Sequence, residues 1–385
     1  MTSQTPQRTQ NQHAQGPASP TPGALRPEAL WAEFTELLNS ASSVFAWEGL
    51  ELDDLDRAEG LRYLARLTEN AIANMMSTAS PKHPRFRLLS NGFGMDNPDN
   101  HYLGAPVDAR YTYRVTGNVG RLSYLSFAAQ NQNYAQRDAI TGGADHIDAS
   151  QLITDSDGAF AITASADERP GNWLRLAPDT TLLLVRQTRA DPTSERWVDI
   201  GIENLDVDMS PPPLRPDRIQ HKLQAVALYT AGAANWFVDW VRPWLATPNQ
   251  TTLSDPAEQQ RVGGDPRILS QSGYWTLAPD EALVVRFVPP PCDYWNFQLA
   301  NIWAECLDAR RPIWRNNATA QVDEDGSVTL VIAHADPGHP NWLDTAGHRH
   351  GLMHARFVNA AENRRVTCQI VDFGSIASDP SDTSH

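Results

Sequence analysis

The chain has 385 residues and a formal net charge of -15, from 46 acidic and 31 basic side chains. This length fits two domains better than one, and the acidic charge argues against a nucleic-acid partner, which requires concentrated Lys and Arg. No stretch approaches the roughly 20 apolar residues of a membrane span, and residues 1–26 lack the apolar core of a signal peptide. The three cysteines form no paired motif, which favours a reducing compartment. Together these features lead us to expect a cytoplasmic protein without a membrane span.

Hydrophobic spacing and turn residues divide the chain into helical and β-rich segments. Helices are predicted from Pro27, over about Leu52 to Met76 and over about Ile219 to Val241, each with apolar residues at helical spacing. Alternating strand patterns begin after Pro81 and resume after Pro243. In chain order we expect a disordered tail (1–26), a helical segment (27–80), a first β-rich repeat (81–210), a linker and helix (211–246), a second β-rich repeat (247–375) and a polar tail (376–385).

The two β-rich segments share motifs in the same order, which is the most informative feature of the sequence. The first copy reads Asp157-Gly158, then Asn172-Trp173-Leu174, then a strand ending at Arg186. The second copy reads Asp325-Gly326, then Asn341-Trp342-Leu343, then a strand ending at Arg356. Four shared elements, counting the one upstream of these, indicate duplication of one unit.

The upstream element pairs Tyr113-Arg114 and Tyr124 of the first copy with Val285-Arg286 and Tyr294 of the second. The repeat predicts a mainly β fold with α additions, in which duplicated antiparallel β-sandwich or jelly-roll-like units accompany N-terminal and central helices. Asp-Gly supplies a turn, and we expect the Asn-Trp-Leu segment to be a loop whose indole plugs the end of the core. Residues present in both copies, including the two arginines, are expected to serve the fold first.

The second copy carries ionisable residues that the first copy lacks. Between Trp342 and Arg356 these are Asp344, His348, His350 and His354. If residues 350–358 form a strand, alternate residues share a face. One face then holds His350, Leu352, His354, Arg356 and Val358, and the other, an ordinary core face, holds Met353, Ala355 and Phe357.

His348 is the candidate proton carrier of a catalytic site. Imidazole titrates near neutral pH, and a carboxylate such as Asp344 can fix its tautomer. Arg356 or Asn296 would stabilise developing oxygen charge. The alternative for His348 is a turn histidine bonded to backbone, and the alternative for His350 and His354 is polar strand residues that face solvent.

The same histidines form the pattern H-x-H-x-x-x-H, which is similar to metal sites on β-scaffolds. The pattern lacks the glutamate that usually follows in jelly-roll metal sites, and Arg356 would repel a dication. We therefore predict no cofactor, and we keep a divalent metal held by His348, His350 and His354 as an alternative. The acidic run Asp53-Asp54-Leu55-Asp56 is interpreted as a helix start, where acids favour the helix dipole.

A polar set after Pro291, together with the tryptophan of the repeated motif, is the candidate substrate-binding surface. Its members are Tyr294, Asn296, Gln298, Trp303, Glu305 and Trp342. Cross-strand hydrogen bonding within the sheet is the alternative role for the amides. The chain has 12 tryptophans, most of which will pack in cores, while others can line an apolar pocket.

Several phrases are specific enough to compare with known families. They are Asp293-Tyr-Trp-Asn-Phe-Gln-Leu-Ala-Asn-Ile-Trp303, Asp325-Gly326, Pro340-Asn-Trp-Leu-Asp-Thr-Ala-Gly-His348 with Gly351 and Arg356, and upstream Asn97-Pro-Asp-Asn-His101-Tyr102. Together they resemble the bacterial family of domain of unknown function 1214, often found with domain of unknown function 1254, over most of residues 90–375. The resemblance implies a β-sandwich and a hydrophobic, steroid-like or terpenoid-like substrate of catabolism, but no settled reaction. His350 and His354 do not belong to the family pattern.

The leading hypothesis is a cofactor-independent enzyme that carries out hydration, dehydration, isomerisation or hydrolysis on a hydrophobic small molecule. One alternative is a non-catalytic module that binds a hydrophobic ligand or assembles with a protein. The other is a His-ligated metalloenzyme. A homo-oligomer is an option that the sequence leaves open.

Overall fold

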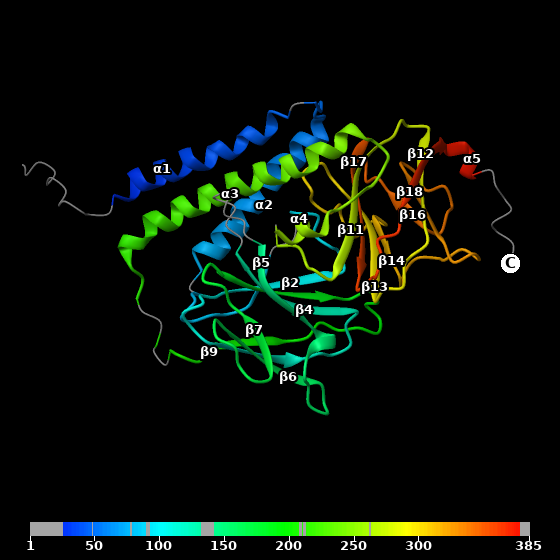
Figure 1. Ribbon diagram of the computed structural model, residues 1–385. Helices are drawn as coiled ribbons and strands as arrows, with labels where there is room; N and C mark the ends of the chain where they lie inside the picture. The colour runs from blue at the N-terminus through cyan, green and yellow to red at the C-terminus, as the bar shows by residue number, and fades with distance from the viewer. Residues whose placement is uncertain are drawn as a thin grey trace, which may run out of the picture.

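The computed structural model describes residues 26–377, apart from 48, 78, 90–92, 132–141, 208–209, 211–212 and 262. The predicted disordered tail before residue 26 and the polar tail from residue 378 lie outside the described residues. Three long helices lie above the first β-rich unit, drawn in cyan to green, and the second unit, drawn in yellow to red, stands beside their right-hand end (Figure 1).

The helices of this layer start where the sequence predicts. Helix α1 has Pro27 in its first turn, where the missing N–H is not needed. Helix α2 begins with a capping box, in which the side chains of Asp53 and Asp56 each accept the other's backbone N–H at 2.9 Å. The helical segments are α1 (Pro27–Asn39), η1 (Ser40–Phe45), α2 (Asp54–Met75), η3 (Ala149–Gln151), η4 (Pro216–Arg218), α3 (Ile219–Val241), η5 (Arg242–Ala246), α4 (Pro256–Arg261) and α5 (Phe373–Ala377).

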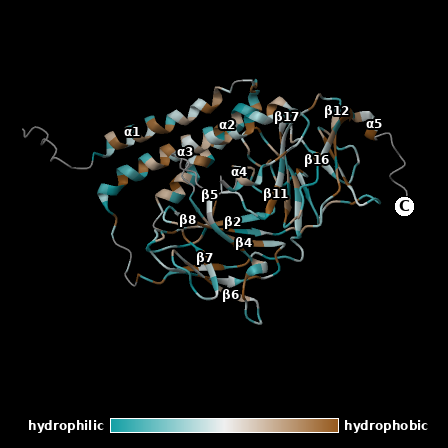
Figure 2. Ribbon diagram, in the orientation of Figure 1, coloured by the Kyte–Doolittle hydropathy of each residue, from teal (hydrophilic) through white to brown (hydrophobic). Residues whose placement is uncertain are grey.

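Helices α1 and α3 carry hydrophobic residues among hydrophilic ones, as expected of helices with one packed face (Figure 2). Both α1 and α2 pack along α3. Within the described ranges, none of the helices combines the length and the apolar character that a membrane crossing requires.

The first sandwich packs a five-stranded sheet, in the order β1-β2-β8-β4-β5, on a four-stranded sheet, in the order β7-β6-β3-β9. Phe127 and Val185 from the first sheet meet Val115 and Ile162 from the second in one buried core. The strands are β1 (Arg87–Leu88), β2 (Asn100–Pro106), β3 (Tyr113–Asn118), β4 (Tyr124–Asn131), β5 (Gly142–Asp148), β6 (Ala159–Ser165), β7 (Asn172–Arg175), β8 (Leu182–Thr188) and β9 (Ile200–Asn204).

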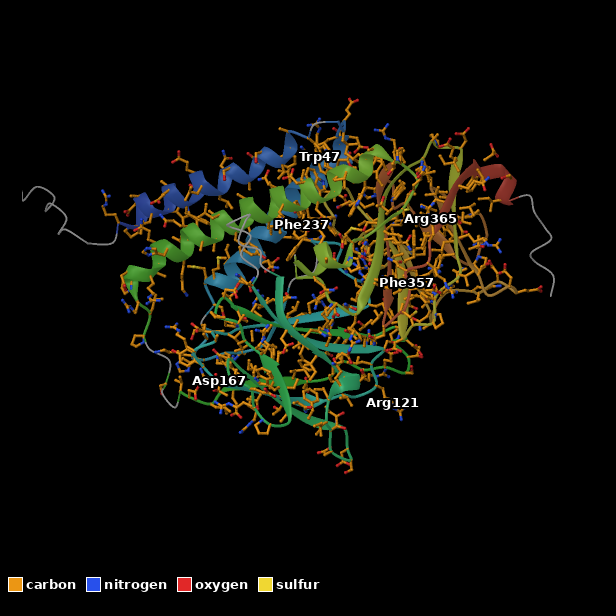
Figure 3. All side chains as sticks on the ribbon, viewed as in Figure 1. Trp47, Arg121, Asp167, Phe237, Phe357 and Arg365 are labelled. Atoms are coloured by element: carbon orange, nitrogen blue, oxygen red, sulfur yellow. The ribbon has the colours of Figure 1, made fainter. Side chains whose placement is uncertain are left out.

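The second sandwich repeats this arrangement, with sheets in the orders β10-β11-β17-β13-β14 and β16-β15-β12-β18. The one-to-one match of strand order confirms the predicted mainly β architecture of two related units. Its core includes Phe357, which Figure 3 labels within these strands. The strands are β10 (Thr252–Leu253), β11 (Ile268–Thr276), β12 (Glu281–Phe287), β13 (Tyr294–Ala300), β14 (Trp314–Asn316), β15 (Val328–Ala333), β16 (Trp342–Asp344), β17 (His350–Val358) and β18 (Thr367–Asp372).

The repeated asparagines make the same hydrogen bonds in both sandwiches. Asn172 bonds the N–H and the carbonyl of Ile153, and Asn341 bonds the N–H and the carbonyl of Gln321. Each amide also donates to a carbonyl of the neighbouring strand, β6 or β15. Because each side chain joins a loop to a strand, both asparagines serve the fold.

The repeated indoles do not plug the core, which corrects the sequence prediction. The Asn-Trp-Leu segments form the parallel edge strands β7 and β16, in which neighbouring side chains point to opposite faces. Leu174 and Leu343 are fully buried in the two cores. Trp173 and Trp342 are half-buried, and Trp342 packs on the outer face of its sheet beside Val331, its partner on β15.

The expected correspondence of Arg114 with Arg286 is wrong by two residues. Arg114 pairs with Thr163, which itself pairs with Trp173. In the second sandwich Val331 pairs with Trp342, and the β12 partner of Val331 is Val284. Strand register, which a sequence comparison of short motifs does not fix, therefore places Val284 at the position of Arg114.

Strand β17 is buried along its whole length, and its two faces have different surroundings. Met353, Ala355 and Phe357 lie in the sandwich core, as predicted. On the other face His350 and His354 are 6% and 5% exposed, so neither faces solvent. This second face is therefore where polar groups of β17 meet other parts of the molecule.

Candidate functional site

A cavity of about 350 Å³ lies where the two sandwiches and α3 meet. Its lining comes from strands of both sandwiches, from α3 and η5, and from the segments before β2 and β11. Figure 3 shows Phe237, a lining residue on α3, above the junction of the sandwiches. Small-molecule sites typically have volumes of about 300–1,000 Å³, so this cavity is large enough to be one.

The wall provided by α3 and η5 is aromatic. Trp236, Trp240 and Trp244 follow at intervals of four residues and therefore share one side of this helical segment. The rings of Trp236 and Trp240 stack with centroids 5.9 Å apart, and Trp240 meets Trp244 edge to face at 5.0 Å. Phe93 and Phe237, 5.6 Å apart, extend the wall. The wall is a broad apolar surface suited to flat or rigid hydrocarbon.

Two arginines at matching positions contribute charged groups to the lining of the cavity. Arg186 lies on β8 and Arg356 on β17, the central strands of the two five-stranded sheets. We call residues 95–99, before β2, and 263–267, before β11, the entry loops. Arg186 donates to the carbonyl of Gly263 at 3.0 Å, and Arg356 donates to the carbonyl of Met95.

The two entry loops are exchanged between the sandwiches. Asp265 of the second loop accepts a hydrogen bond from the hydroxyl of Tyr124 on β4 at 3.1 Å. Asn97 of the first loop donates to the hydroxyl of Tyr294 on β13 at 3.0 Å. Met95 and Gly263 begin the loops with φ values of +57° and +85°, a left-handed conformation that is unusual for the non-glycine residue. Each loop thus docks in the same way on the sheet of the other sandwich.

Asp265 supplies the negative charge on the side of the first sandwich. Its carboxylate lies 3.1 Å from Nε2 of His146 and 3.5 Å from Nη1 of Arg186. Burial alone would raise the pKa of Asp265, but the hydrogen bond from His146 and the charge of Arg186 outweigh it and hold the pKa well below its usual range. Arg186 is therefore compensated by a charged carboxylate.

Arg356 has neutral partners instead. Its Nη1 donates to Oε1 of Gln298 at 2.5 Å and reaches Oδ1 of Asn296 at 3.5 Å, while Nη2 donates to the Met95 carbonyl. Among the described residues no carboxylate lies within ion-pair distance of this guanidinium. Asn296 and Gln298, which the sequence predicted as substrate-binding residues, thus hold the arginine that lines the cavity.

His354 is a second polar group of the lining. Its Nδ1 lies 2.7 Å from the hydroxyl of Ser272. Burial, and then the positive charge of Arg356, lower the pKa of His354 well below its usual value, so its imidazole is neutral at neutral pH. Among the described residues its Nε2 makes no hydrogen bond, which leaves this nitrogen as an acceptor or donor for another molecule.

His348 lies away from the cavity, between the second sandwich and α2. Its Nδ1 is 2.9 Å from the carbonyl of Thr345, and its Nε2 is 2.8 Å from the carboxylate of Glu59. Burial alone would lower the pKa of His348, but the hydrogen bond and charge of Glu59 outweigh burial and raise it. Asp344, predicted to orient His348, instead faces Arg311 at 2.5 Å. The orienting carboxylate is therefore Glu59.

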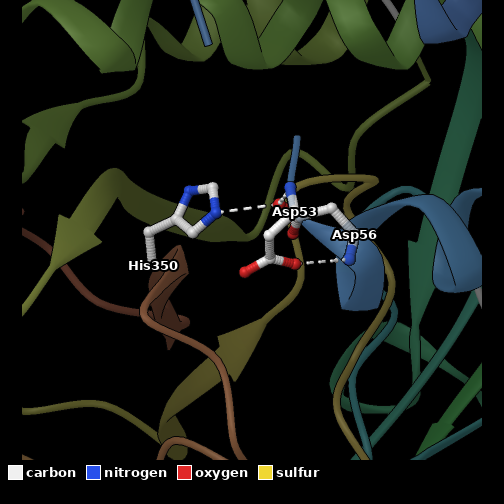
Figure 4. Close-up of side chains that lie close together, drawn as sticks. All are labelled: Asp53, Asp56 and His350. Atoms are coloured by element: carbon white, nitrogen blue, oxygen red, sulfur yellow. Dashed lines mark hydrogen bonds and ion pairs between the residues drawn. The ribbon is translucent and has the colours of Figure 1, made fainter. Parts of the chain in front are cut away.

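The three histidines of the predicted metal pattern do not converge on one centre. His348 contacts Glu59, while His350 contacts Asp56 at 3.0 Å (Figure 4) and His354 contacts a serine. The group in the described chain whose atoms approach within 4.8 Å is Asp53, Asp56 and His350. The capping box of α2 already accounts for the two carboxylates of that group.

Trp303 and Glu305 belong to the contact between the helices and the second sandwich. The indole of Trp303 stacks on Tyr63 with centroids 5.9 Å apart and meets Trp47 edge to face at 5.5 Å. Glu305 is fully buried and accepts from Arg66 at 3.0 Å. Neither residue lines the cavity, and Trp342 lies on an outer face.

Sequence analysis did not identify the cavity wall, Glu59 or Asp265, but the sequence does contain a pattern that indicates the wall. Trp236 and Trp240 lie four residues apart on a predicted helix, and Trp244 follows at the same interval just beyond its predicted end. The side of the helical segment that they mark lines the cavity. Glu59 has no such signal, because its partner His348 is 289 residues away in the chain. The same applies to Asp265, whose partners Tyr124 and Arg186 belong to the other sandwich.

The pattern of one known family matches the second sandwich. Residues 272–362, from β11 to beyond β17, match the family described as "Protein of unknown function (DUF1214)". No curated protein matches the sequence.

One solved structure extends the likeness to most of the chain. The crystal structure of an uncharacterized protein from Burkholderia cenocepacia is similar with 39% identity and a TM-score of 0.87, covering 90% of this chain and 97% of that chain. The VPA0106 protein from Vibrio parahaemolyticus is 11% identical with a TM-score of 0.46, over 86% of this chain and 99% of that chain.

Proposed function

This chain belongs to the family of proteins of unknown function DUF1214, and because that description names no reaction, we propose a function from the cavity itself. The protein binds an apolar small molecule between its two sandwiches and α3. The observation that carries this proposal is that an aromatic wall and polar side chains line one cavity of about 350 Å³.

The composition of the lining supports a small-molecule ligand. Ligand sites usually combine apolar and aromatic walls with a few polar groups that fix orientation. Here Trp236, Trp240 and Trp244 form the wall, and Arg356 and His354 are polar groups of the same lining. A rigid steroid-like or terpenoid-like molecule suits such a wall, because little conformational entropy is lost when it binds.

Tryptophan fluorescence and calorimetry test the proposal with a bicyclic probe, 2-(1-naphthyl)ethanol. We expect saturable binding that Trp240→Ala weakens about tenfold, because an aromatic contact of this kind contributes roughly 1–2 kcal/mol. Trp173→Ala is the matched control, since Trp173 is equally half-buried but lies on β7, outside the cavity. Binding that is equal in the wild type and Trp240→Ala would overturn the proposal.

Acid–base chemistry on the bound molecule is the second candidate, in the classes of hydration, dehydration, isomerisation or hydrolysis. One observation favours it: His354 lines the cavity with a neutral ring and an unused Nε2. His348 is less suited, because both of its nitrogens already have partners. Deuterium uptake beside the ketone of 2-tetralone should exceed the buffer rate and disappear in His354→Gln. Uptake at the buffer rate in the wild type would remove this candidate.

A further inference from the structure

We propose that the ligand of this cavity carries an oxyanion, a carboxylate foremost, and that Arg356 binds it. This inference rests on the proposed binding function and adds the chemical class of the ligand. The ligand would be an amphipathic acid, with its hydrocarbon body on the tryptophan wall and its charged end at β17.

The first argument is the electrostatic state of Arg356. A guanidinium stays protonated in proteins, and a buried cation without a counter-ion is costly. Arg356 is 8% exposed, and it donates to a backbone carbonyl and to the side-chain amides of Gln298 and Asn296. Its Nε–H has no hydrogen-bond acceptor among the described residues. A carboxylate in the cavity would supply both the missing charge and an acceptor.

The second argument is the internal comparison that duplication provides. Tyr102 pairs with Arg186 and Ser270 pairs with Arg356, so these two residues are equivalent. Counting five residues back from each reaches Asn97 in one entry loop and Asp265 in the other. Asp265 gives Arg186 its counter-ion. At the same place beside the second sheet the chain has an uncharged amide, Asn97. Of the two matched arginines, Arg356 is therefore the one without a carboxylate at ion-pair distance among the described residues.

The remaining charged residues of the lining do not take over this role. Asp265 is bound to Arg186 and His146. Asp255 and Glu258 are exposed, on and beside the short helix α4. Asp96 is half-buried, and the burial of its carboxyl group raises its pKa despite the charges of Arg356 and Arg66. Neutral His354 adds no positive charge, so the attraction for an anion is centred on Arg356.

The wall and the arginine together limit the class of ligand. An inorganic anion would leave the tryptophans exposed to water, and a neutral hydrocarbon would leave the guanidinium without an acceptor. A molecule with both parts satisfies both sides of the cavity. Rings of one or two fused units or a medium-length alkyl chain, each ending in a carboxylate, are the simplest such molecules.

A matched pair of probes tests the inference on the intact chain. 1-Naphthylacetate and 2-(1-naphthyl)ethanol share an apolar body and differ in charge. Calorimetry at pH 7.5 should show at least about tenfold tighter binding of the acid, because a charge-assisted hydrogen bond is stronger than a neutral one. Decanoate and decanol, compared in the same way, should show the same preference.

Two variants then test whether the tighter binding of the acid depends on Arg356. Arg356→Gln removes the cation, and Asn97→Asp adds the carboxylate that the first sandwich has at the equivalent place. Each should reduce the acid-to-alcohol ratio to near one. Arg286→Gln is the control, because Arg286 is exposed and paired with Asp325 far from the lining, and it should keep the wild-type ratio.

The outcomes separate the two proposals. Equal binding of acid and alcohol by the wild type overturns the oxyanion inference and leaves the binding function standing. An acid preference that persists in both folded variants, as checked by their thermal unfolding, also overturns it. If neither probe binds saturably, the proposed function itself fails.

Discussion

The two sandwiches have the same strand order, yet their five-stranded sheets present their outer faces to different neighbours. In the second sandwich Tyr274 and Leu352 join the buried core of the helical layer. Among the described residues, no strand residue of the first sandwich belongs to that core. The two sandwiches therefore share a strand order, which duplication explains. The role of a residue on the outer face of a sheet depends on which other element packs against that face.

The largest loss of stability should come from replacing Asp265, the carboxylate that pairs with Arg186 and has no counterpart at Arg356. Asp265→Asn leaves Arg186 and His146 without their counter-ion, and breaking a buried pair by removing one partner costs about 3–5 kcal/mol. Urea unfolding measures this loss in the free energy of unfolding.

The equivalent residue of the other loop provides the control for this comparison. Asn97→Ala removes neutral hydrogen bonds to Tyr294 and Asn296 and should cost only about 1–3 kcal/mol. Equal losses in the two variants would mean that the charge of Asp265 does not distinguish the two halves.

A smaller and pH-dependent effect should appear where the second sandwich docks on α2. Glu59→Gln breaks the buried pair with His348 and should cost about 3 kcal/mol near pH 6. The pKa of His348 is raised above 6.5, so its contribution is complete below pH 6.5 and is lost as pH rises through the raised value. The pKa of Glu59 is lowered below 4.5 because His348 and Arg62 outweigh burial, so its contribution is complete above pH 4.5 and is lost as pH falls.

The difference in stability between the wild type and Glu59→Gln should therefore be greatest between about pH 4.5 and 6.5 and should shrink on both sides. Thermal unfolding at several pH values measures it. A difference that grows steadily from pH 6.5 to alkaline pH would contradict the assignment of Glu59 and His348 as the pair.

The smallest loss of stability should come from the repeated asparagines, and it should be equal in the two sandwiches. Asn172→Ala and Asn341→Ala each remove one amide with matching hydrogen bonds, and each should cost about 1–3 kcal/mol through buried groups left unsatisfied. Urea unfolding of the two variants gives a direct comparison. A loss in one half alone would show that the two asparagines are not equivalent.

The sequence predicted the repeated frame because the signals for it are local. The Asp-Gly turns and the start of α2 after Asp53 each depend on a few neighbouring residues, and both Gly158 and Gly326 have the positive φ that such turns use. The Asn-Trp-Leu segments, predicted as loops, are instead edge strands, because their pairing depends on β6 and β15. The faces of β17 followed from alternation alone. The strand register around Arg114 did not, because a two-residue slip keeps the same residues on the same face.

The cavity was not predictable in the same way. The sequence predicted Asn296 and Gln298 as substrate-binding residues and Arg356 as a group that stabilises oxygen charge. Their grouping with the Met95 carbonyl depends on the approach of the entry loop that precedes β2 of the first sandwich. His348 was paired with the nearest carboxylate in the sequence, Asp344, whereas the fold brings Glu59 from α2. Residues that lie far apart in the chain become neighbours only through packing.

The exchanged entry loops have a consequence for how the molecule loses its structure. Since residues 95–99 finish the surface of the second sheet and residues 263–267 finish that of the first, neither half on its own has a complete exterior. Each sandwich therefore stabilises the other, and a substitution that destabilises one sandwich should destabilise both. We expect such a chain to melt as one cooperative body rather than as two independent modules.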